Sequence, residues 1–203
     1  MDEHVKKTAL NLGCGSNKII GALNVDLYDV CEPDLVWDLN DTPWPLDTES
    51  FDTVTAHHVL EHLVDWWSAF EEIARVTKVG GQVEIAVPHE SASTALGMRD
   101  HLHLFSQWSF HGIQGVGYST SAWGEVEYES IPMRMTTIDL VPYGPYQWMA
   151  KWCPWLLRFC AVHLRNFIHT SRYRFERLET QESYDDVLSM HAVRTGAEQV
   201  GHK

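Results

Sequence analysis

A glycine turn and the acidic residue that follows it form the first group of residues that could do chemistry. Gly13 and Gly15 end a largely apolar run at residues 8–12, which predicts a buried parallel strand that leads into a tight turn. Glycine permits positive φ and lets the backbone approach a ligand without obstruction from a Cβ atom. Asp26 ends a second short strand at residues 23–26, where a carboxylate can accept hydrogen bonds from both hydroxyls of a ribose. The pattern predicts a pocket for a ligand that contains a nucleoside.

Histidines form the second such group. The chain has 12 of them, and imidazole titrates near neutral pH, so a histidine in a pocket can remove a proton from a substrate hydroxyl. His57 and His58 follow a predicted strand at residues 51–56, where an α/β sheet presents side chains to its ligand. We expect one of the two to line the pocket through its backbone and His58 to be a candidate base. The alternative for each is a purely structural histidine.

These residues need a sheet whose strands end at a common edge. Strands are predicted at residues 8–12, 23–26, 34–40, 51–56 and 82–87. Residues 58–77 carry apolar side chains at intervals of three and four, which predicts a helix with one apolar face. Residues 16–22 leave room for a helix of about two turns. Alternating strands and helices favour an α/β fold, with a mostly parallel sheet and helices on both faces.

The second half of the chain is less regular. Ser106 is placed to cap a short helix, and residues 125–131 alternate as a strand does. Pro154 is suited to the first turn of a helix that reaches about Thr170. We expect residues 89–180 to cover the substrate as loops and helices, with a helical lid.

Composition and charge exclude several classes of protein. With 203 residues and 44% hydrophobic residues, the chain is expected to form one folded domain. The net charge is −13, and residues 1–100 hold six Lys and Arg against eighteen Asp and Glu, so binding to a phosphate backbone is disfavoured. Lys18 stands where a dinucleotide fingerprint needs a third glycine, which argues against a nicotinamide oxidoreductase. The cysteines form no zinc pattern and the start of the chain lacks a signal-peptide core, so we expect a cytoplasmic protein.

Several motifs together resemble a known family. They are Leu-Asn-Leu-Gly-Cys-Gly at 10–15, Asn-Val-Asp at 24–26, Asp38-Leu39, Ser-Phe-Asp at 50–52, His-Val-Leu-Glu-His at 58–62 and Lys-Val-Gly-Gly at 78–81. In this order they resemble the class I S-adenosylmethionine-dependent methyltransferases, and in particular the short bacterial ones. The resemblance spans roughly the first half of the chain. It implies a Rossmann-like seven-stranded sheet, S-adenosylmethionine as cofactor and S-adenosylhomocysteine as product.

The resemblance also implies roles for individual residues. Residues 1–88 would form the cofactor-binding half, 181–195 the last sheet strand, antiparallel at the edge, and 196–203 a flexible tail. Cofactor contacts would come from Asn11, Gly13, Cys14, Gly15, Asp26, Leu27, Asp38, Leu39 and His57. The segment at residues 100–110 resembles the family region that folds over the active site and carries a histidine. We therefore expect His103 as the first candidate for the catalytic base, His101 as the second and His58 as the third.

A divalent metal is an alternative that we do not favour for this site. His58, Glu61 and His62 would share one helical face, and with His103 they would supply four ligands. Two groups of metal-using methyltransferases, which act on ubiquinone precursors and on the 3′ ends of small RNAs, look similar here. This chain departs from both because His58 stands where they have a glutamate, which would shift preference from magnesium towards zinc or iron.

Basic residues recur every seven positions near the end of the chain. Lys151, Arg158, Arg165 and Arg172 would form one stripe on a helix, beside Trp and Phe side chains. Such a stripe is a solvated helix face, a guide for an anionic substrate, or a contact with a membrane surface through residues 151–172.

The sequence thus predicts a methyltransferase that moves a methyl group to a small-molecule acceptor, anionic or aromatic, preferably at a hydroxyl oxygen and with a histidine base. Two alternatives stay open. One is a catalytically silent cofactor-binding protein with a regulatory or assembly role, and the other is a metal-assisted nucleic-acid 2′-O-methyltransferase. The oligomeric state is not predicted.

Overall fold

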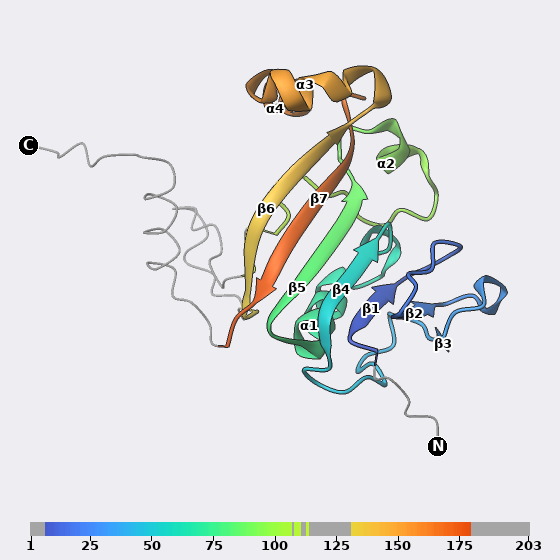
Figure 1. Cartoon of the computed structure of the whole chain (residues 1–203). Coiled ribbons are helices and arrows are strands. Elements are labelled where there is room, and N and C mark those ends of the chain that lie inside the picture. Colours follow the sequence, from blue (N-terminus) through green and yellow to red (C-terminus); the bar gives the residue numbers. More distant parts are fainter. Residues whose placement is uncertain (1–6, 107, 111–112, 114–130, 180–203) are drawn as a thin grey trace, which may run out of the picture.

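The computed structural model describes residues 7–106, 108–110, 113 and 131–179, and its centre is a seven-stranded sheet (Figure 1). The strands are β1 (Ala9–Leu12), β2 (Ala22–Asp26), β3 (Leu35–Val36), β4 (Phe51–His57), β5 (Thr77–Pro88), β6 (Met133–Pro142) and β7 (Ile168–Arg177). Their order in the sheet is β3-β2-β1-β4-β5-β7-β6. The first five are parallel, and β7 runs antiparallel between β5 and β6. This confirms the predicted Rossmann-like, mostly parallel sheet.

The helical segments are few and short. They are η1 (Asp29–Cys31), η2 (Leu60–His62), α1 (Trp66–Val76), α2 (Ser93–Gly97), η3 (Gly144–Tyr146), α3 (Gln147–Trp152) and α4 (Pro154–His163). The helix predicted at 58–77 begins late, because Asp65 caps α1 by accepting hydrogen bonds from the backbone N–H groups of Trp67 and Ser68. The preceding residues form a loop and η2, and this loop leads to the site.

The main core lies between α1 and one face of the sheet. The side chains of Phe70 and Ile73 on α1 are fully buried there, with the ring of Phe70 about 5 Å from those of Phe110 and Phe175. Tyr173 on β7 donates a hydrogen bond to the carbonyl oxygen of Ser106 at 2.5 Å, which ties the segment after β5 to the sheet. Burial raises the pKa of this tyrosine well above its ordinary value.

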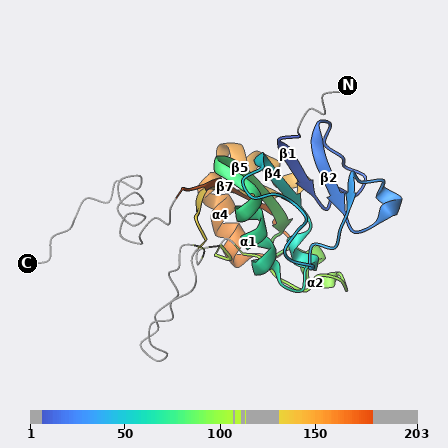
Figure 2. The same ribbon diagram turned by 90° about the horizontal axis from the view of Figure 1, so that it is seen from below.

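The opposite face of the sheet is polar, and none of the described helices covers it (Figures 1 and 2). Thr53 and Gln82 are exposed there although they lie on central strands. Glu84 on β5 holds Arg174 at 2.9 Å and Arg172 at 3.3 Å in ion pairs along this face. Burial acts to raise the pKa of Glu84, but hydrogen bonds from its partners outweigh it and the pKa lies below its ordinary value.

The helix arrangement therefore differs from the expectation of helices on both faces. In the described chain the connections after β1 and after β2, residues 13–21 and 27–34, hold only turns and the short helix η1. The first of them spans nine residues and must also cross between parallel strands, which leaves too little chain for a packed helix. The predicted helix at 16–22 was wrong for this reason.

The second half also departs from the prediction. The helix expected from Pro154 to about Thr170 ends at His163, and the chain continues as β7, so the antiparallel strand beside β5 comes from Ile168–Arg177. The region 89–180 therefore contains two sheet strands as well as covering segments. In the described residues after Ser106 the chain forms a turn, in which the Ser106 hydroxyl accepts from the N–H of Trp108 at 3.1 Å. Residues 125–130 of the strand predicted at 125–131, and the whole strand predicted at 181–195, lie outside the described residues.

The length of the helices decides whether one of them could cross a membrane. Among the described residues, no helix combines the length and apolar character that crossing a membrane requires.

Candidate functional site

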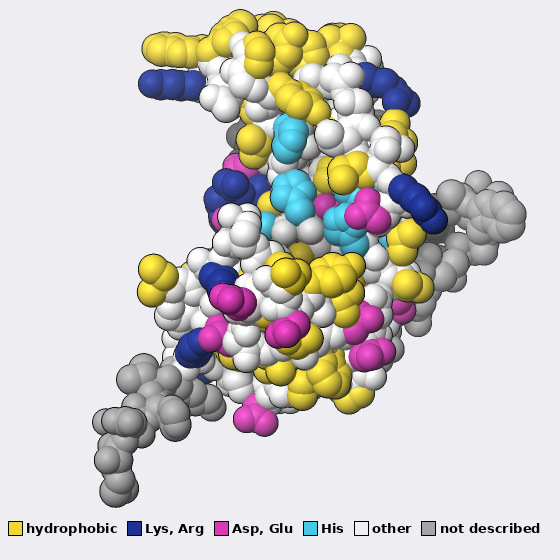
Figure 3. Space-filling view, turned by 90° about the vertical axis from the view of Figure 1, so that its right-hand side faces the viewer, with side chains coloured by type: hydrophobic (Ala, Val, Ile, Leu, Met, Phe, Trp, Pro, Cys, Tyr) yellow, Lys and Arg dark blue, Asp and Glu magenta, His cyan; other side chains and the backbone are white. Residues whose placement is uncertain are grey.

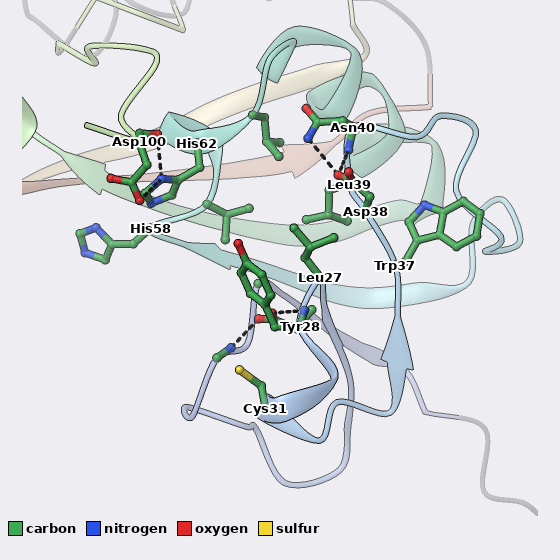
Figure 4. A pocket seen from close by; sticks show the side chains of 15 residues that line it. Leu27, Tyr28, Cys31, Trp37, Asp38, Leu39, Asn40, His58, His62 and Asp100 are labelled. Carbon is green, nitrogen blue, oxygen red and sulfur yellow. Dashed lines mark hydrogen bonds and ion pairs between the residues drawn. The ribbon is translucent and has the colours of Figure 1, made fainter. Parts of the chain in front are cut away.

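A cavity of about 400 Å³ opens at the carboxyl ends of β1, β2 and β4 (Figure 4). Its size lies in the usual range for small-molecule sites. Its position is the one at which open α/β sheets bind ligands. The cavity is lined by Gly13, Gly15, Asp26, Leu27, Tyr28, Cys31, Trp37, Asp38, Leu39, Asn40, His58, Val59, His62, Leu63 and Asp100.

The glycine turn forms one wall of this cavity. Gly13 and Gly15 both have positive φ, +59° and +47°, which a side chain would strain. A Cβ atom on Gly13 would stand 2.1 Å from Cγ2 of Val59, so this glycine permits close packing with the loop after β4. A Cβ atom on Gly15 would meet nothing within 4 Å. The space beside Gly15 is therefore open to a ligand.

Asp26 is held by backbone hydrogen bonds at the end of β2. Its Oδ2 atom accepts from the N–H of Gly15 at 2.8 Å, and its Oδ1 atom accepts from the N–H of Tyr28 at 3.0 Å. Each carboxylate oxygen can accept a further bond. The side chain is therefore oriented by the chain itself and keeps acceptor capacity for ribose hydroxyls.

Apolar surface for a flat ring lies next to Asp26. Leu27 is 47% exposed and Tyr28 is 64% exposed, although both line the cavity. Beyond them Asp38 accepts two hydrogen bonds from Asn40, from its backbone N–H and from its side-chain amide, both at 2.9 Å. An adenine ring could pack on the exposed apolar side chains with its amino edge towards Asp38.

Comparisons with known proteins indicate a methyltransferase domain in the first half of the chain. Residues 10–85 match a family model described as "Methyltransferase domain". These residues include most of β1, all of β2 and the glycine turn, so the match covers the cavity wall just described. Residues 10–85 therefore carry a methyltransferase domain, which is consistent with a class I S-adenosylmethionine-dependent methyltransferase. Its cofactor is S-adenosylmethionine and its product is S-adenosylhomocysteine.

Solved structures show that the fold extends beyond the matched residues. One similar structure is a complex between Trm112 of Haloferax volcanii, a methyltransferase activator, and a protein described as a methyltransferase, with 17% identity, TM-score 0.53, and coverage of 86% of this chain and 84% of that one. A second is described as a sarcosine dimethylglycine methyltransferase from Galdieria sulphuraria, with 12% identity, TM-score 0.53, and coverage of 86% and 79%.

A third similar structure is the [4+2]-cyclase SpnF, with 13% identity, TM-score 0.52, and coverage of 84% and 75%. Identities this low establish the fold alone, and one fold supports several reactions. Among proteins of curated function, none matches the chain.

Two histidines of the methyltransferase domain reach the cofactor cavity. His62 places Nδ1 3.0 Å from the backbone oxygen of Asp100 and 3.3 Å from its Oδ2 atom (Figure 4). His58, whose φ of +56° lies in the left-handed region, places Nδ1 3.2 Å from Oε1 of Glu61. Because these partners are acceptors, Nδ1 of each ring is the donor and Nε2 holds the lone pair. Either Nε2 atom could accept a proton or bind a cation.

Other predicted residues of the methyltransferase site lie outside the cavity lining. His103 approaches the carbonyl oxygen of Leu63 with Nε2 at 2.9 Å, and His101 approaches that of Ala95 with Nδ1 at 3.3 Å. His57 pairs with Glu84 on the polar face of the sheet. Between the two candidates at the loop after β4, it is thus His58 that lines the cavity.

Asn11 and Cys14 support the turn from behind. The side-chain amide of Asn11 donates to the backbone oxygen of Asn17 at 3.1 Å and to Oδ1 of Asn24 at 2.9 Å. Cys14 is buried, and burial together with the charge of Asp26 raises the pKa of its thiol. Both residues belong to the first strand and its turn, and neither side chain lines the cavity.

Sequence reasoning missed several lining residues. Tyr28, Cys31, Trp37 and Asn40 have no motif, and Asp100 was not singled out within the segment at residues 100–110. They line the cavity because the chain returns to it after β2, after β3 and before Phe105. Two of them gave a signal: Tyr28 directly follows the predicted adenine contact Leu27, and Asp100 opens the segment expected to fold over the active site.

A group of ligand atoms that could hold a divalent cation lies beside the cavity. A carboxylate oxygen of Glu61 and a ring nitrogen from each of His62 and His101 lie within 4.8 Å of one another. Glu61 is 1% exposed, and its Oε2 atom has no hydrogen-bond partner among the described residues. The predicted ligand set changes accordingly, because the ring of His103 is directed at backbone carbonyl oxygens and His101 takes its place. His58, the other predicted ligand, is not part of the group.

The loop that carries His101 is fixed to η2 by backbone bonds. The N–H groups of Leu102 and His103 both donate to the carbonyl oxygen of Glu61, at 2.7 and 3.3 Å. The rings of His62 and His101 then meet edge to face with centroids 4.9 Å apart. This pairing across about 40 residues of sequence positions Asp100 and His101 next to the end of β4.

Proposed function

We propose that this methyltransferase transfers the methyl group to a hydroxyl oxygen of a small-molecule acceptor, with His62 as the general base. The observation that carries the proposal is the cavity in which the glycine turn, Asp26 and the imidazole of His62 meet. S-adenosylmethionine, when bound, supplies a methyl group on a positively charged sulfur atom. The acceptor oxygen needs a base because it must lose its proton as the new bond forms.

The charge of the cavity suits that donor. Asp26, Asp38 and Asp100 line it, and no lysine or arginine is among the lining residues. Carboxylates in a partly enclosed site attract a cation and disfavour an anionic ligand. A nucleic-acid acceptor is disfavoured for the same reason, since residues 1–100 carry a net charge of −12.

His62 is favoured as base because its orientation is fixed. The Nδ1–H group of His62 donates to the backbone oxygen and to the Oδ2 atom of Asp100, which keeps the lone pair on Nε2. The carboxylate of Asp100 would also stabilise the imidazolium that forms after proton removal. His58 is the second candidate, with Glu61 in the corresponding position. His103 and His101, the first candidates from the sequence, would act on the acceptor only after movement of their loop.

The test compares the wild type with His62→Gln, His58→Gln and His163→Gln. His163 lies at the end of α4 with its ring against Phe159, so its variant is a matched control. Release of S-adenosylhomocysteine is measured with a panel of phenols, aliphatic alcohols and amines. We expect transfer to hydroxyl acceptors, and His62→Gln should lower kcat by about 10²–10⁴-fold. It should also abolish the acidic limb of the pH–rate profile, while His163→Gln leaves both unchanged.

Three outcomes would contradict the proposal. Transfer to amines alone would reject the hydroxyl acceptor, and a normal rate with His62→Gln would reject this base. Retained cofactor binding without transfer to any acceptor would favour the catalytically silent alternative. Methylation of an oligonucleotide that requires a divalent metal would instead favour the nucleic-acid 2′-O-methyltransferase.

A further inference from the structure

Helices α3 and α4 expose an unusual amount of aromatic surface. Trp148 and Trp152 on α3 are 53% and 72% exposed, and Trp155 and Phe159 on α4 are 71% and 55% exposed. A large aromatic side chain has 150–250 Å² of surface, so these four expose roughly 400–600 Å² together. This matches or exceeds the largest apolar patch of a typical monomer, which is often functional. Figure 3 shows hydrophobic side chains crowded over the end of the molecule that these helices form.

The apolar residues of α4 lie on two sides. Leu157, Cys160 and Ala161 are buried against Met149 and Ile168, and so face the protein. Trp155, Phe159 and Val162 follow the spacing i, i+4 and i+7, which places them together on the outer side. A helix with apolar residues on both sides needs cover on its outer side as well. In the described parts of the chain nothing provides that cover.

Basic residues lie among these aromatic ones. Arg158 stands three residues after Trp155, and Lys151 stands between the two tryptophans of α3, with its ammonium 5.3 Å from the centroid of the Trp152 ring. Lys151, Arg158 and Arg165 are all exposed. Within the described residues, none of the three has a carboxylate at ion-pair distance.

The charge of this segment is opposite to that of the whole chain. Residues 140–175 contain five Lys and Arg and no Asp or Glu, in a chain whose net charge is −13. Arg172 and Arg174 face Glu84 on the polar side of the sheet, which leaves Lys151, Arg158 and Arg165 for a partner. That partner must be anionic and must also accept tryptophan and phenylalanine rings.

We propose that α3 and α4 form a docking surface for an anionic phospholipid bilayer. Indole rings favour the boundary between headgroups and acyl chains, and nearby Lys and Arg bind anionic headgroups. The two helices are too short to cross the bilayer and lie on its surface. They follow the carboxyl end of β6 and lie beyond the end of β5 (Figure 1), at the sheet edge to which β1 and β4 also point. The bound membrane therefore faces the edge that carries the cofactor cavity.

The test is cosedimentation of the full chain with vesicles. Vesicles of phosphatidylcholine with about 30% phosphatidylserine are compared with pure phosphatidylcholine vesicles at low and high salt. We expect binding to the anionic vesicles that weakens with salt. Each basic residue near the surface contributes about a fivefold gain in partitioning, so Lys151→Gln, Arg158→Gln and Arg165→Gln together should weaken binding about 100-fold. Trp152→Ser with Trp155→Ser should abolish it.

A matched control carries Ile20→Ser and Lys78→Gln. Ile20 is fully exposed, and Lys78 pairs with Asp52 near the opposite end of the molecule. This variant should bind vesicles as the wild type does, and circular dichroism checks that every variant is folded. Absence of binding to anionic vesicles, or binding that the α3–α4 variants leave intact, would overturn the proposal. So would a dimer in gel filtration that the tryptophan substitutions dissociate, because a second copy would then be the occupant. The assay uses no cofactor, so its failure leaves the proposed reaction untouched.

Discussion

The two glycines of the cofactor turn provide the sharpest test of the geometry. Alanine at Gly13 or at Gly15 forces a side chain into left-handed backbone, at a cost of about 1–2 kcal/mol in each case. At Gly13 the added Cβ atom would also stand 2.1 Å from Cγ2 of Val59, which must move. Such overpacking adds about 1–3 kcal/mol. We therefore expect a loss in the free energy of unfolding of about 1–2 kcal/mol for Gly15→Ala and about 2–5 kcal/mol for Gly13→Ala.

Urea unfolding followed by tryptophan fluorescence measures both losses. Val59→Ala in the background of Gly13→Ala removes the clash, so the double-mutant cycle should show a favourable coupling of about 1–3 kcal/mol. Cofactor binding should be weakened more by Gly15→Ala than by Gly13→Ala, because the added Cβ atom at position 15 enters space that is open to the ligand. Gly15→Ala should remain folded yet bind S-adenosylhomocysteine poorly. Equal losses of stability without coupling to Val59, or normal binding by Gly15→Ala, would refute this view of the turn.

The remaining predictions concern pH, a metal and one buried hydrogen bond. Hydrogen bonds from Lys7 and from the backbone of Asn24 hold the pKa of Asp34 at about 2. Stability from this carboxylate is present above its unfolded pKa of about 3.9 and is lost as the pH falls through about 2. Because Asp34 is about one-third exposed, Asp34→Asn should cost about 1 kcal/mol at neutral pH and little in acid, measured by urea unfolding; an equal cost at both pH values would contradict this. Zn²⁺ should raise the Tm of the wild type but not of Glu61→Gln, and no shift for the wild type would reject the cation site. Tyr173→Phe should lower the free energy of unfolding by about 1 kcal/mol through loss of its bond to the Ser106 carbonyl, and an unchanged value would show that bond to be dispensable.

Local patterns predicted the first half of the fold well. β1 and β2 are short, largely apolar runs bounded by glycine or polar residues, and β4 alternates buried apolar residues with polar ones, so nearby chain decides their conformation. Asp26 ends β2 and Asp38 lies two residues after β3, and both line the cavity because parallel strands end at a common edge. The comparisons confirmed the resulting family and cofactor.

Tertiary contacts decided the strand and the histidine positions that local patterns did not predict. Residues 168–177 form β7 because they pair with β5 over seven residue positions and with β6 over nine, and no local pattern separates this stretch from the end of a helix. Contacts between residues far apart in the sequence also determine where the histidine rings lie. Hydrogen bonds from Leu102 and His103 to Glu61 bring His101 to His62 and turn His103 towards Leu63. Spacing along the chain contains no information about such a contact.

The prediction that the basic residues form one stripe on a single helix was wrong for a related reason. A repeat of seven predicts one helical face only if the helix is continuous, but Cys153 and Pro154 divide it and the last member, Arg172, lies on β7. The sequence does not show that Trp152, Trp155 and Phe159 are exposed, because it does not show which side of α4 packs against the protein.

Isothermal titration calorimetry of S-adenosylhomocysteine binding tests the central claim most directly. The wild type is compared with Asp26→Ala and with Asp29→Ala, a matched substitution at an exposed aspartate on η1. Loss of two hydrogen bonds to a charged acceptor should weaken binding by about 100-fold or more for Asp26→Ala, while Asp29→Ala binds normally. Absence of binding heat with the wild type, or unchanged affinity with Asp26→Ala, would contradict the account of this site.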